Sequence, residues 1–329
     1  MKHVSLFLAA VLLAAFLTGC GASPQHTEGP APSDQTTPTA PTTAPANAPA
    51  GSLSLVVLGD SIARGYGLSD PEQQRFSALL QQKLQAVYAQ VSVVNDGVDG
   101  LTGSGLADRL AKQPPAGLDS CDAVLISIGG NNVLGPMVKM TVSEADQAAL
   151  PSLTADYLQY RLLSEDKITP QIKQSLSRMN ALISAAADRL RSKEFADMLQ
   201  AGADDLRRDL PRILSQIRAK NPDCRVFVQT VYNPYRSVSF SLKGIEASLD
   251  LSVPGEQAVS ALNAAITGLA QANGYTVVDV YADFAAADRA VTFAQAGALG
   301  LNFGVDPHPN PAGHERIAEL YFPLLTAAS

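Results

Sequence analysis

The chain has 329 residues, of which 46% are hydrophobic and 17% charged, as in ordinary globular proteins. Its length allows one large domain or two small ones. The formal net charge of −7 and the absence of any run of basic residues argue against a nucleic-acid partner, which would need a cluster of lysine and arginine side chains.

The N-terminal segment is predicted to be a targeting signal rather than part of the fold. Lys2 and His3 precede an apolar run, residues 4–17, that is too short for a typical membrane span. The run ends in LTGC at Cys20, which resembles the lipobox of bacterial lipoproteins, although an ordinary signal peptide that happens to contain a cysteine is the alternative. We expect a lipoprotein signal peptide at residues 1–19 and a diacylglycerol anchor on Cys20.

Residues 20–50 follow as a stretch dominated by proline, threonine and alanine, with almost no large apolar side chain. Such a segment buries too little surface to fold, so we expect a disordered tether that spaces the domain from the membrane. The protein would then be extracytoplasmic and lipid-anchored to the bacterial cell membrane, with residues 51–329 as its globular domain.

From residue 52, short apolar runs alternate with longer amphipathic ones, which predicts an α/β fold with a parallel sheet. The candidate strands show little alternation, as expected of strands covered on both faces. They are residues 53–58, 91–95, 123–128, 225–231 and 275–281. We expect a three-layer α/β/α domain with strand order 2-1-3-4-5 and right-handed connections.

Helices are predicted between these strands. Asp70 is placed as an N-cap before Pro71, and an apolar stripe continues from Phe76 to Val87. Further helices are expected at residues 255–272 and 311–325. About ninety residues separate the third and fourth strands, far more than a crossover needs, and their helical spacing predicts an insertion at residues 137–200. It would form either a cap over the active site or an extra helical layer.

Two cysteines, Cys121 and Cys224, remain in the domain after Cys20 is assigned to the anchor. Each comes just before a predicted buried strand, and these two strands are expected to be neighbours in the sheet. An exported domain permits a disulfide, so we expect one here, with two buried free thiols as the alternative.

Chemistry-bearing residues follow the first three strands. The first strand runs directly into Gly59-Asp60-Ser61, which places the serine where α/β sheets bind ligands. Glycine-rich loops, residues 95–102 and 129–132, follow the next two strands at the same edge. Neither has the spacing of a phosphate or dinucleotide loop, and the G-x-S-x-G elbow does not occur around Ser61.

A nucleophilic serine needs a base. Of the four histidines, His3 and His26 lie in the signal and tether, which leaves His308 and His314. His308 lies in a loop stiffened by two prolines just before the last predicted helix. His314 lies near the first turn of that helix, where we expect it to pack or to cap, so His308 is the candidate base.

These motifs together resemble the four blocks of the SGNH (GDSL-type) hydrolases: G-D-S near the start, a glycine in the second loop, G-x-N in the third and H-P before the final helix. The stretches LGDSIARGYGLS and VVNDGVDGLT are most similar to the bacterial thioesterase/lysophospholipase branch. The resemblance spans about residues 53–326, apart from the long third crossover. It implies a flavodoxin-like sheet and an ester hydrolase without metal or cofactor.

The resemblance also implies a role for each matched position. Ser61 would attack the acyl carbonyl, and His308 would take its proton and pass it to the leaving group. The oxyanion would be held by the N–H of Ser61, the N–H of Gly100 and the side-chain amide of Asn131.

The chain departs from the family pattern at two positions. Asn132 replaces the aspartate of the usual G-x-N-D block, a change expected to alter support for the loop and not the chemistry. The acid usually lies three residues before the histidine, where this chain has Val305, and the nearest carboxylate is Asp306. Asp306 completes a triad with His308, or a backbone carbonyl supports the histidine in a dyad.

The preferred function is hydrolysis of carboxylic esters, such as acyl lipids or small esters, through an acyl-enzyme. Removal of O-acetyl groups from cell-wall or environmental polysaccharide is the alternative within enzymes. A ligand-binding lipoprotein on an inactive hydrolase scaffold is the non-enzymatic alternative. An apolar groove beneath residues 137–200 would favour acyl chains, and open, polar surroundings of Ser61 would favour sugar.

Overall fold

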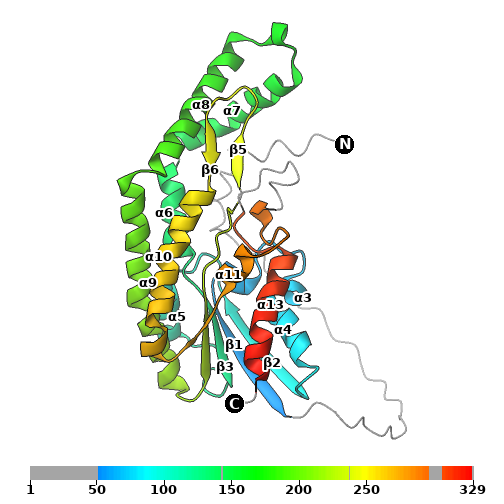
Figure 1. Ribbon diagram of the computed structural model, residues 1–329, viewed down its shortest axis with the longest axis vertical. Coiled ribbons are helices and arrows are strands. Elements are labelled where there is room, and N and C mark those ends of the chain that lie inside the picture. Colours follow the sequence, from blue (N-terminus) through cyan, green and yellow to red (C-terminus); the bar gives the residue numbers. More distant parts are fainter. Residues whose placement is uncertain (1–50, 142–143, 237, 296–305, 328–329) are drawn as a thin grey trace, which may run out of the picture.

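The computed structural model describes residues 51–141, 144–236, 238–295 and 306–327 (Figure 1). The predicted signal peptide, Cys20 and the tether lie outside these described residues. The domain is built on a five-stranded parallel sheet in the order β2-β1-β3-β4-β7. The strands are β1 (Ser52–Gly59), β2 (Gln90–Gly97), β3 (Ala123–Ser127), β4 (Arg225–Gln229) and β7 (Thr276–Val278). Because β7 is the fifth strand of this sheet along the chain, the predicted fold class and strand order are confirmed.

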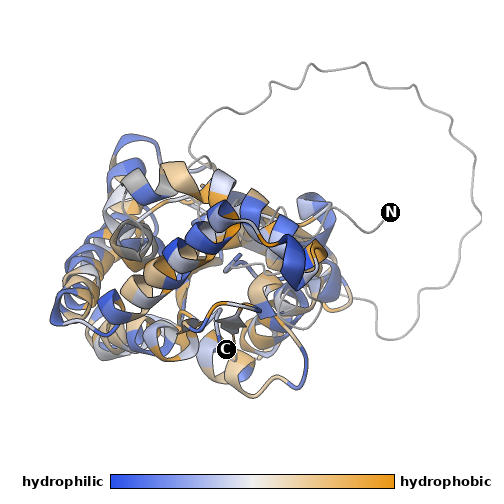
Figure 2. Ribbon diagram, turned by 90° about the horizontal axis from the view of Figure 1, so that it is seen from above, coloured by the Kyte–Doolittle hydropathy of each residue, from blue (hydrophilic) through white to orange (hydrophobic). Residues whose placement is uncertain are grey.

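Helices cover both faces of the sheet (Figure 1). One face carries α5 (Gly103–Lys112), α9 (Lys193–Lys220) and α10 (Ser252–Asn273), and the other carries α4 (Phe76–Leu84), α11 (Val280–Ala285) and α13 (Pro311–Thr326). Seen from above, hydrophobic and hydrophilic residues alternate along the helices, as expected of amphipathic helices on a sheet (Figure 2). No helix within the described residues is long and apolar enough to cross a membrane.

The central strand shows why the sequence reads as unbroken apolar runs. Val56 and Leu58 of β1 belong to the hydrophobic core on the α9 side, and Leu55 and Val57 belong to the core on the α13 side. Successive side chains of a strand point to opposite faces, and both faces here are covered by helices. All four residues are at most 2% exposed, so no polar position alternates with them.

The predicted helix from Pro71 to Val87 is interrupted. The structure has α3 (Pro71–Gln74) and α4, with Arg75 between them in an extended conformation. The backbone N–H of Phe76, at the start of α4, donates to Nδ1 of the buried His314 at 3.2 Å. Val87 is 39% exposed and lies outside the apolar stripe, so the prediction of one continuous helix is wrong at both places.

The long third crossover is helical, as predicted. It contains α6 (Asn131–Thr141), α7 (Glu144–Leu162), the short 3₁₀ helix η1 (Glu165–Lys167), α8 (Pro170–Arg189) and α9. The α7–α8 hairpin extends away from the sheet (Figure 1). An unpredicted antiparallel pair, β5 (Ser239–Ser241) and β6 (Ser248–Asp250), packs beside α8, where Ala247 N donates to Asn180 Oδ1 at 2.7 Å.

The expected disulfide is absent, and Cys121 and Cys224 are buried free thiols. The strands that follow them are neighbours, as predicted, because Ala123 pairs with Arg225. The two thiols contact each other, and each has a further partner: Cys121 Sγ lies 3.7 Å from the Leu118 carbonyl oxygen, and Cys224 Sγ donates to the Asn221 carbonyl at 3.3 Å. The prediction that the two thiols lie close together is confirmed, and the prediction of a disulfide between them is wrong.

Candidate active site

Ser61 lies at the carboxyl end of the central strand, as the first residue of the short helix α2 (Ser61–Arg64). Gly59 precedes this turn with a φ of +149°, and a Cβ at that position would overlap the carbonyl oxygen of Ser127 on the neighbouring strand. Asp60 N donates to the same Ser127 carbonyl at 3.1 Å. The glycine therefore lets the chain leave the sheet against β3 and present a nearly buried serine at its edge.

Ser61, His308 and Asp306 form a continuous chain of short contacts. Ser61 Oγ lies 2.8 Å from His308 Nε2, and His308 Nδ1 lies 2.5 Å from Asp306 Oδ1. The same carboxylate oxygen accepts the backbone N–H of His308 at 3.0 Å. The segment from Asp306 to His308 is thus a turn in which the aspartate side chain accepts the backbone N–H two residues further on. A carboxylate two positions before the histidine thereby reaches the imidazole, which spacing alone did not establish.

The loop that carries His308 is held by contacts to its backbone. Phe293 N donates to the His308 carbonyl at 3.0 Å, and the hydroxyl of buried Tyr232 donates to the Pro307 carbonyl at 2.9 Å. Burial holds the pKa of Tyr232 well above its ordinary value, so this phenol keeps its proton. The ring of Tyr66 lies 4.5 Å from the imidazole, centroid to centroid. The imidazole is therefore fixed in position toward Ser61.

The predicted oxyanion donors are distributed over three loops. Asn131, the first residue of α6, lines the same pocket as Ser61 and His308, and its amide nitrogen donates to the Leu101 carbonyl at 3.1 Å. Gly100 is exposed, has a φ of +73° and lies next to Leu101. Among the described residues, none accepts a hydrogen bond from the N–H of Ser61 or of Gly100. Asn131 therefore lies beside Ser61, whereas no hydrogen bond among the described residues joins Gly100 to Ser61.

Asp60 is a site residue that the sequence analysis missed. Asp60 is 2% exposed, and its carboxylate accepts the N–H of Ile62 at 3.0 Å and lies 3.5 Å from the amide nitrogen of Asn131. Burial raises its pKa from 3.8 to about 7, and the hydrogen bond from Ile62 partly opposes this rise. Its position between a buried strand and the candidate nucleophile was the available signal.

A cavity of about 50 Å³ opens beside Ser61 and His308. Most of its lining is apolar, contributed by α6, by the segment after β4 and by α10. The apolar lining residues include Ile62, Val133, Met137, Val231, Pro234, Ala258, Val259, Leu262 and Pro307. Of the described residues in the predicted 137–200 insertion, only Met137 lines this cavity, so the α7–α8 hairpin does not cover it.

His314 caps rather than reacts, as expected. It is fully buried, and burial lowers its pKa to about 3, so it is neutral when it accepts the N–H of Phe76. Within the described residues, no group of three or more histidine, cysteine, aspartate or glutamate side chains is placed to hold a metal ion.

A serine, a histidine and an aspartate joined in this order, here at the carboxyl edge of a parallel sheet, form the side-chain arrangement of serine hydrolases. The chain belongs to the GDSL-like lipase/acylhydrolase family, whose model matches residues 57–316. Membership of this family supports an acyl ester hydrolase and agrees with the SGNH resemblance of the motifs.

Solved structures of a lipase, a phospholipase and an esterase are similar to the chain, and the lipase shares its fold. The chain is similar to a lipase from a goat rumen metagenome, with 17% identity, a TM-score of 0.51 and coverage of 82% of this chain and 95% of that one. It is also similar to phospholipase A1 from Streptomyces albidoflavus NA297 (21% identity, TM-score 0.46, 84% and 99% covered). A third is a mutant acetyl-xylooligosaccharide esterase from Geobacillus Stearmophilus (18%, 0.48, 86% and 97%). No curated protein matches the chain.

Proposed function

We propose that the protein hydrolyses carboxylic acyl esters through an acyl-enzyme on Ser61. The observation that carries this proposal is the contact chain from Ser61 Oγ to His308 Nε2 at 2.8 Å and from His308 Nδ1 to Asp306 at 2.5 Å. In the tautomer that donates from Nδ1 to the carboxylate, Nε2 is free to accept the serine proton. An intact chain of this kind argues against an inactive scaffold that only binds ligands.

The reaction has two halves. Ser61 Oγ attacks the acyl carbonyl while His308 takes its proton, and the tetrahedral oxyanion is held by the N–H groups of Ser61 and Gly100 and by the Asn131 amide. Collapse breaks the bond to the leaving alcohol, which receives the proton from His308. Water then attacks the acyl-serine with His308 as base, releasing the carboxylic acid and restoring Ser61.

The apolar cavity beside Ser61 supports an acyl group as the part of the substrate that is bound there. Its volume of about 50 Å³ suits a short chain better than a long one. A short pocket also accommodates an acetyl group, so an O-acetyl polysaccharide ester is the second candidate. An apolar lining suits an acyl chain in the cavity better than a sugar ring. Acyl esters of small alcohols or lipids therefore stay the first candidate.

We also propose that Cys20 carries a lipid anchor that holds the enzyme on the outer face of the cell membrane. The LTGC sequence at the end of the apolar run supports this assignment. Globomycin should block processing of the precursor, and Cys20→Ala should release the protein from the membrane fraction. Normal processing in the presence of globomycin would contradict the anchor.

The proposed activity is tested with p-nitrophenyl esters of increasing acyl length. Wild type should hydrolyse them, and Ser61→Ala should lower kcat by about 10⁶-fold, as loss of a nucleophile does in other serine hydrolases. Ser69→Ala, at an exposed position eight residues further on, serves as the matched control and should keep wild-type rates. No hydrolysis of any ester by the wild type, or full activity of Ser61→Ala, would overturn the proposal.

A further inference from the structure

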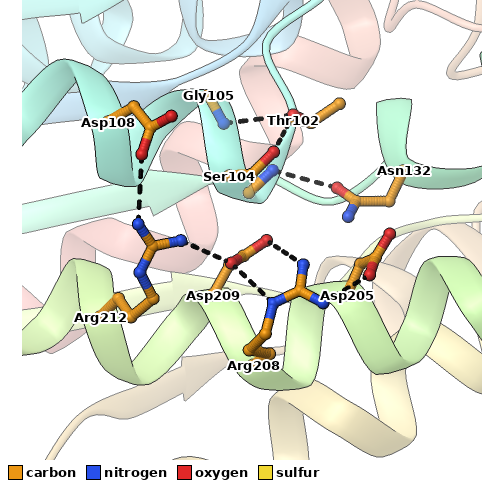
Figure 3. Close-up of polar contacts among 10 residues, drawn as sticks. Thr102, Ser104, Gly105, Asp108, Asn132, Asp205, Arg208, Asp209 and Arg212 are labelled. Carbon is orange, nitrogen blue, oxygen red and sulfur yellow. Dashed lines mark hydrogen bonds and ion pairs between the residues drawn. The ribbon is translucent and has the colours of Figure 1, made fainter.

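Asn132 contacts the chain where the loop that carries Gly100 ends and α5 begins. The side-chain oxygen of Asn132 accepts the N–H of Gly103 at 3.1 Å (Figure 3). Gly103 is the first residue of α5, and the first N–H groups of a helix have no acceptor within it. Thr102 caps the same helix by accepting the N–H of Gly105 at 3.2 Å. A side chain from α6 thus supplies the acceptor that α5 lacks.

Asn131 makes the reciprocal contact. Its amide nitrogen donates to the Leu101 carbonyl at 3.1 Å, while Asn132 accepts from Gly103. Two consecutive residues at the start of α6 therefore hold the chain on both sides of Thr102. Since Gly100 immediately precedes Leu101, these contacts set the position of its N–H relative to the Asn131 amide.

Helix α9 supports both ends of this arrangement. A Cβ on Gly202 would lie 2.7 Å from the Asn132 carbonyl oxygen, and one on Gly103 would lie 3.3 Å from the Asp209 Cβ. Asp209 is fully buried and pairs with Arg212 at 2.9 Å and with Arg208 at 3.3 Å (Figure 3). The start of α5 and the start of α6 are therefore packed on one rigid helix.

We propose that Asn132 is a positioning residue that fixes the Gly100 N–H relative to the Asn131 amide, so that both groups meet the developing oxyanion. The inference rests on the proposed ester hydrolysis. It also explains the departure from the G-x-N-D pattern. The side-chain oxygen of an asparagine accepts the Gly103 N–H as that of an aspartate would, so the replacement keeps the acceptor.

Two variants remove this hydrogen bond from opposite sides. Asn132→Ala deletes the acceptor, and Gly103→Pro deletes the donor at a helix position where proline is favoured. Gly103→Ala, which adds the same Cβ 3.3 Å from the Asp209 Cβ but keeps the N–H, is the control for Gly103→Pro and should keep kcat closer to wild type. Thr102 has an extended backbone, with φ −95° and ψ 171°, which suits a following proline. Each variant should lower kcat about 10- to 100-fold with KM within about twofold, because misplaced donors weaken only the transition state. Binding of a trifluoromethyl ketone transition-state analogue should weaken in parallel.

Asn132→Asp keeps an acceptor oxygen and should recover kcat to within about fivefold of wild type. Arg207→Gln breaks an exposed ion pair with Asp204 on α9 and should change neither kcat nor analogue binding. The proposal is overturned if folded Asn132→Ala or Gly103→Pro keeps kcat within twofold of wild type. Equal impairment of Asn132→Asp and Asn132→Ala would overturn it as well.

Hydrogen–deuterium exchange gives a readout that does not need catalysis. In a Ser61→Ala background, Asn132→Ala should speed exchange of the segment 96–105, and Arg207→Gln should not. Unchanged exchange in segment 96–105 would refute the positioning role of Asn132, even if the wild type hydrolysed esters. If the wild type hydrolysed no ester but exchange accelerated as expected, the proposed function would fail while the structural contact stood.

Discussion

Removal of the Asp306 carboxylate is the sharpest test of the contact chain at Ser61. Its Oδ1 lies 2.5 Å from His308 Nδ1, and its side chain is 35% exposed. When His308 takes the serine proton, it becomes an imidazolium beside this carboxylate. Two unit charges about 4 Å apart attract by about 4 kcal/mol at the effective dielectric constant of about 20 that suits a site near the surface. Loss of that attraction corresponds to about 10³-fold in kcat.

The assay is kcat for a short p-nitrophenyl ester with wild type, Asp306→Ala and Asp306→Asn. Asn can still accept the backbone N–H of His308 but carries no charge, so it separates the turn from the electrostatic effect. Both variants should lose about 10³-fold and still exceed Ser61→Ala, which removes the nucleophile. A rate for Asp306→Ala within threefold of wild type would refute this reasoning and indicate a Ser61–His308 dyad.

Three further predictions concern titration and pocket shape. Burial raises the pKa of Asp60 from 3.8 to about 7, so its contribution to stability is lost as pH rises between these values. In urea unfolding, Asp60→Asn should therefore gain stability relative to wild type from pH 5 to pH 8. A difference in unfolding free energy between the two proteins that stays constant with pH would contradict this. Burial lowers the pKa of His314 from 6.5 to about 3, so its contribution is present above pH 6.5 and lost as pH falls toward 3. His314→Asn should therefore flatten the fall in stability between pH 6.5 and 4, and an unchanged slope would count against a buried neutral imidazole. Val259→Phe should fill the cavity beside Ser61. The kcat/KM for a butyrate ester should fall at least about tenfold, and that for an acetate ester should change less than about threefold. Equal losses of kcat/KM for the two esters would place the acyl group elsewhere.

The parallel sheet was predictable from sequence because burial on both faces removes alternation from each strand. Most departures arise from contacts between distant residues. The break before Phe76 lies within a segment from Pro71 that reads as one continuous helix, and it coincides with a hydrogen bond to His314, 238 residues away. The β5–β6 pair has only three residues in each strand, and a contact from Ala247 to Asn180 holds it beside α8. Short polar strands of this kind carry no periodic signal.

The candidate site was predictable where a residue type and its place after a strand suffice. Ser61 and Asn131 follow the ends of β1 and β3, and His308 precedes the last helix. The reach of Asp306 was not predictable, because it depends on a backbone turn that the spacing of two residues does not specify. Asp60 was missed for a similar reason, since its raised pKa follows from burial that appears only when the sheet and α2 are assembled.

The role of the long third crossover follows from where its last helix runs. The α7–α8 hairpin extends away from the sheet and contributes no residue to the described lining of the cavity at Ser61, so it is not a cap in this structure. Helix α9 returns from the insertion and has one buried face that extends from Phe195 to Ile217. Midway, it packs against Gly103 and Asn132. Of the helices in this crossover, α9 belongs to the layer that covers the sheet and supports the loops at the site, so substitutions along the buried face of α9 should affect kcat more than substitutions in α7 or α8.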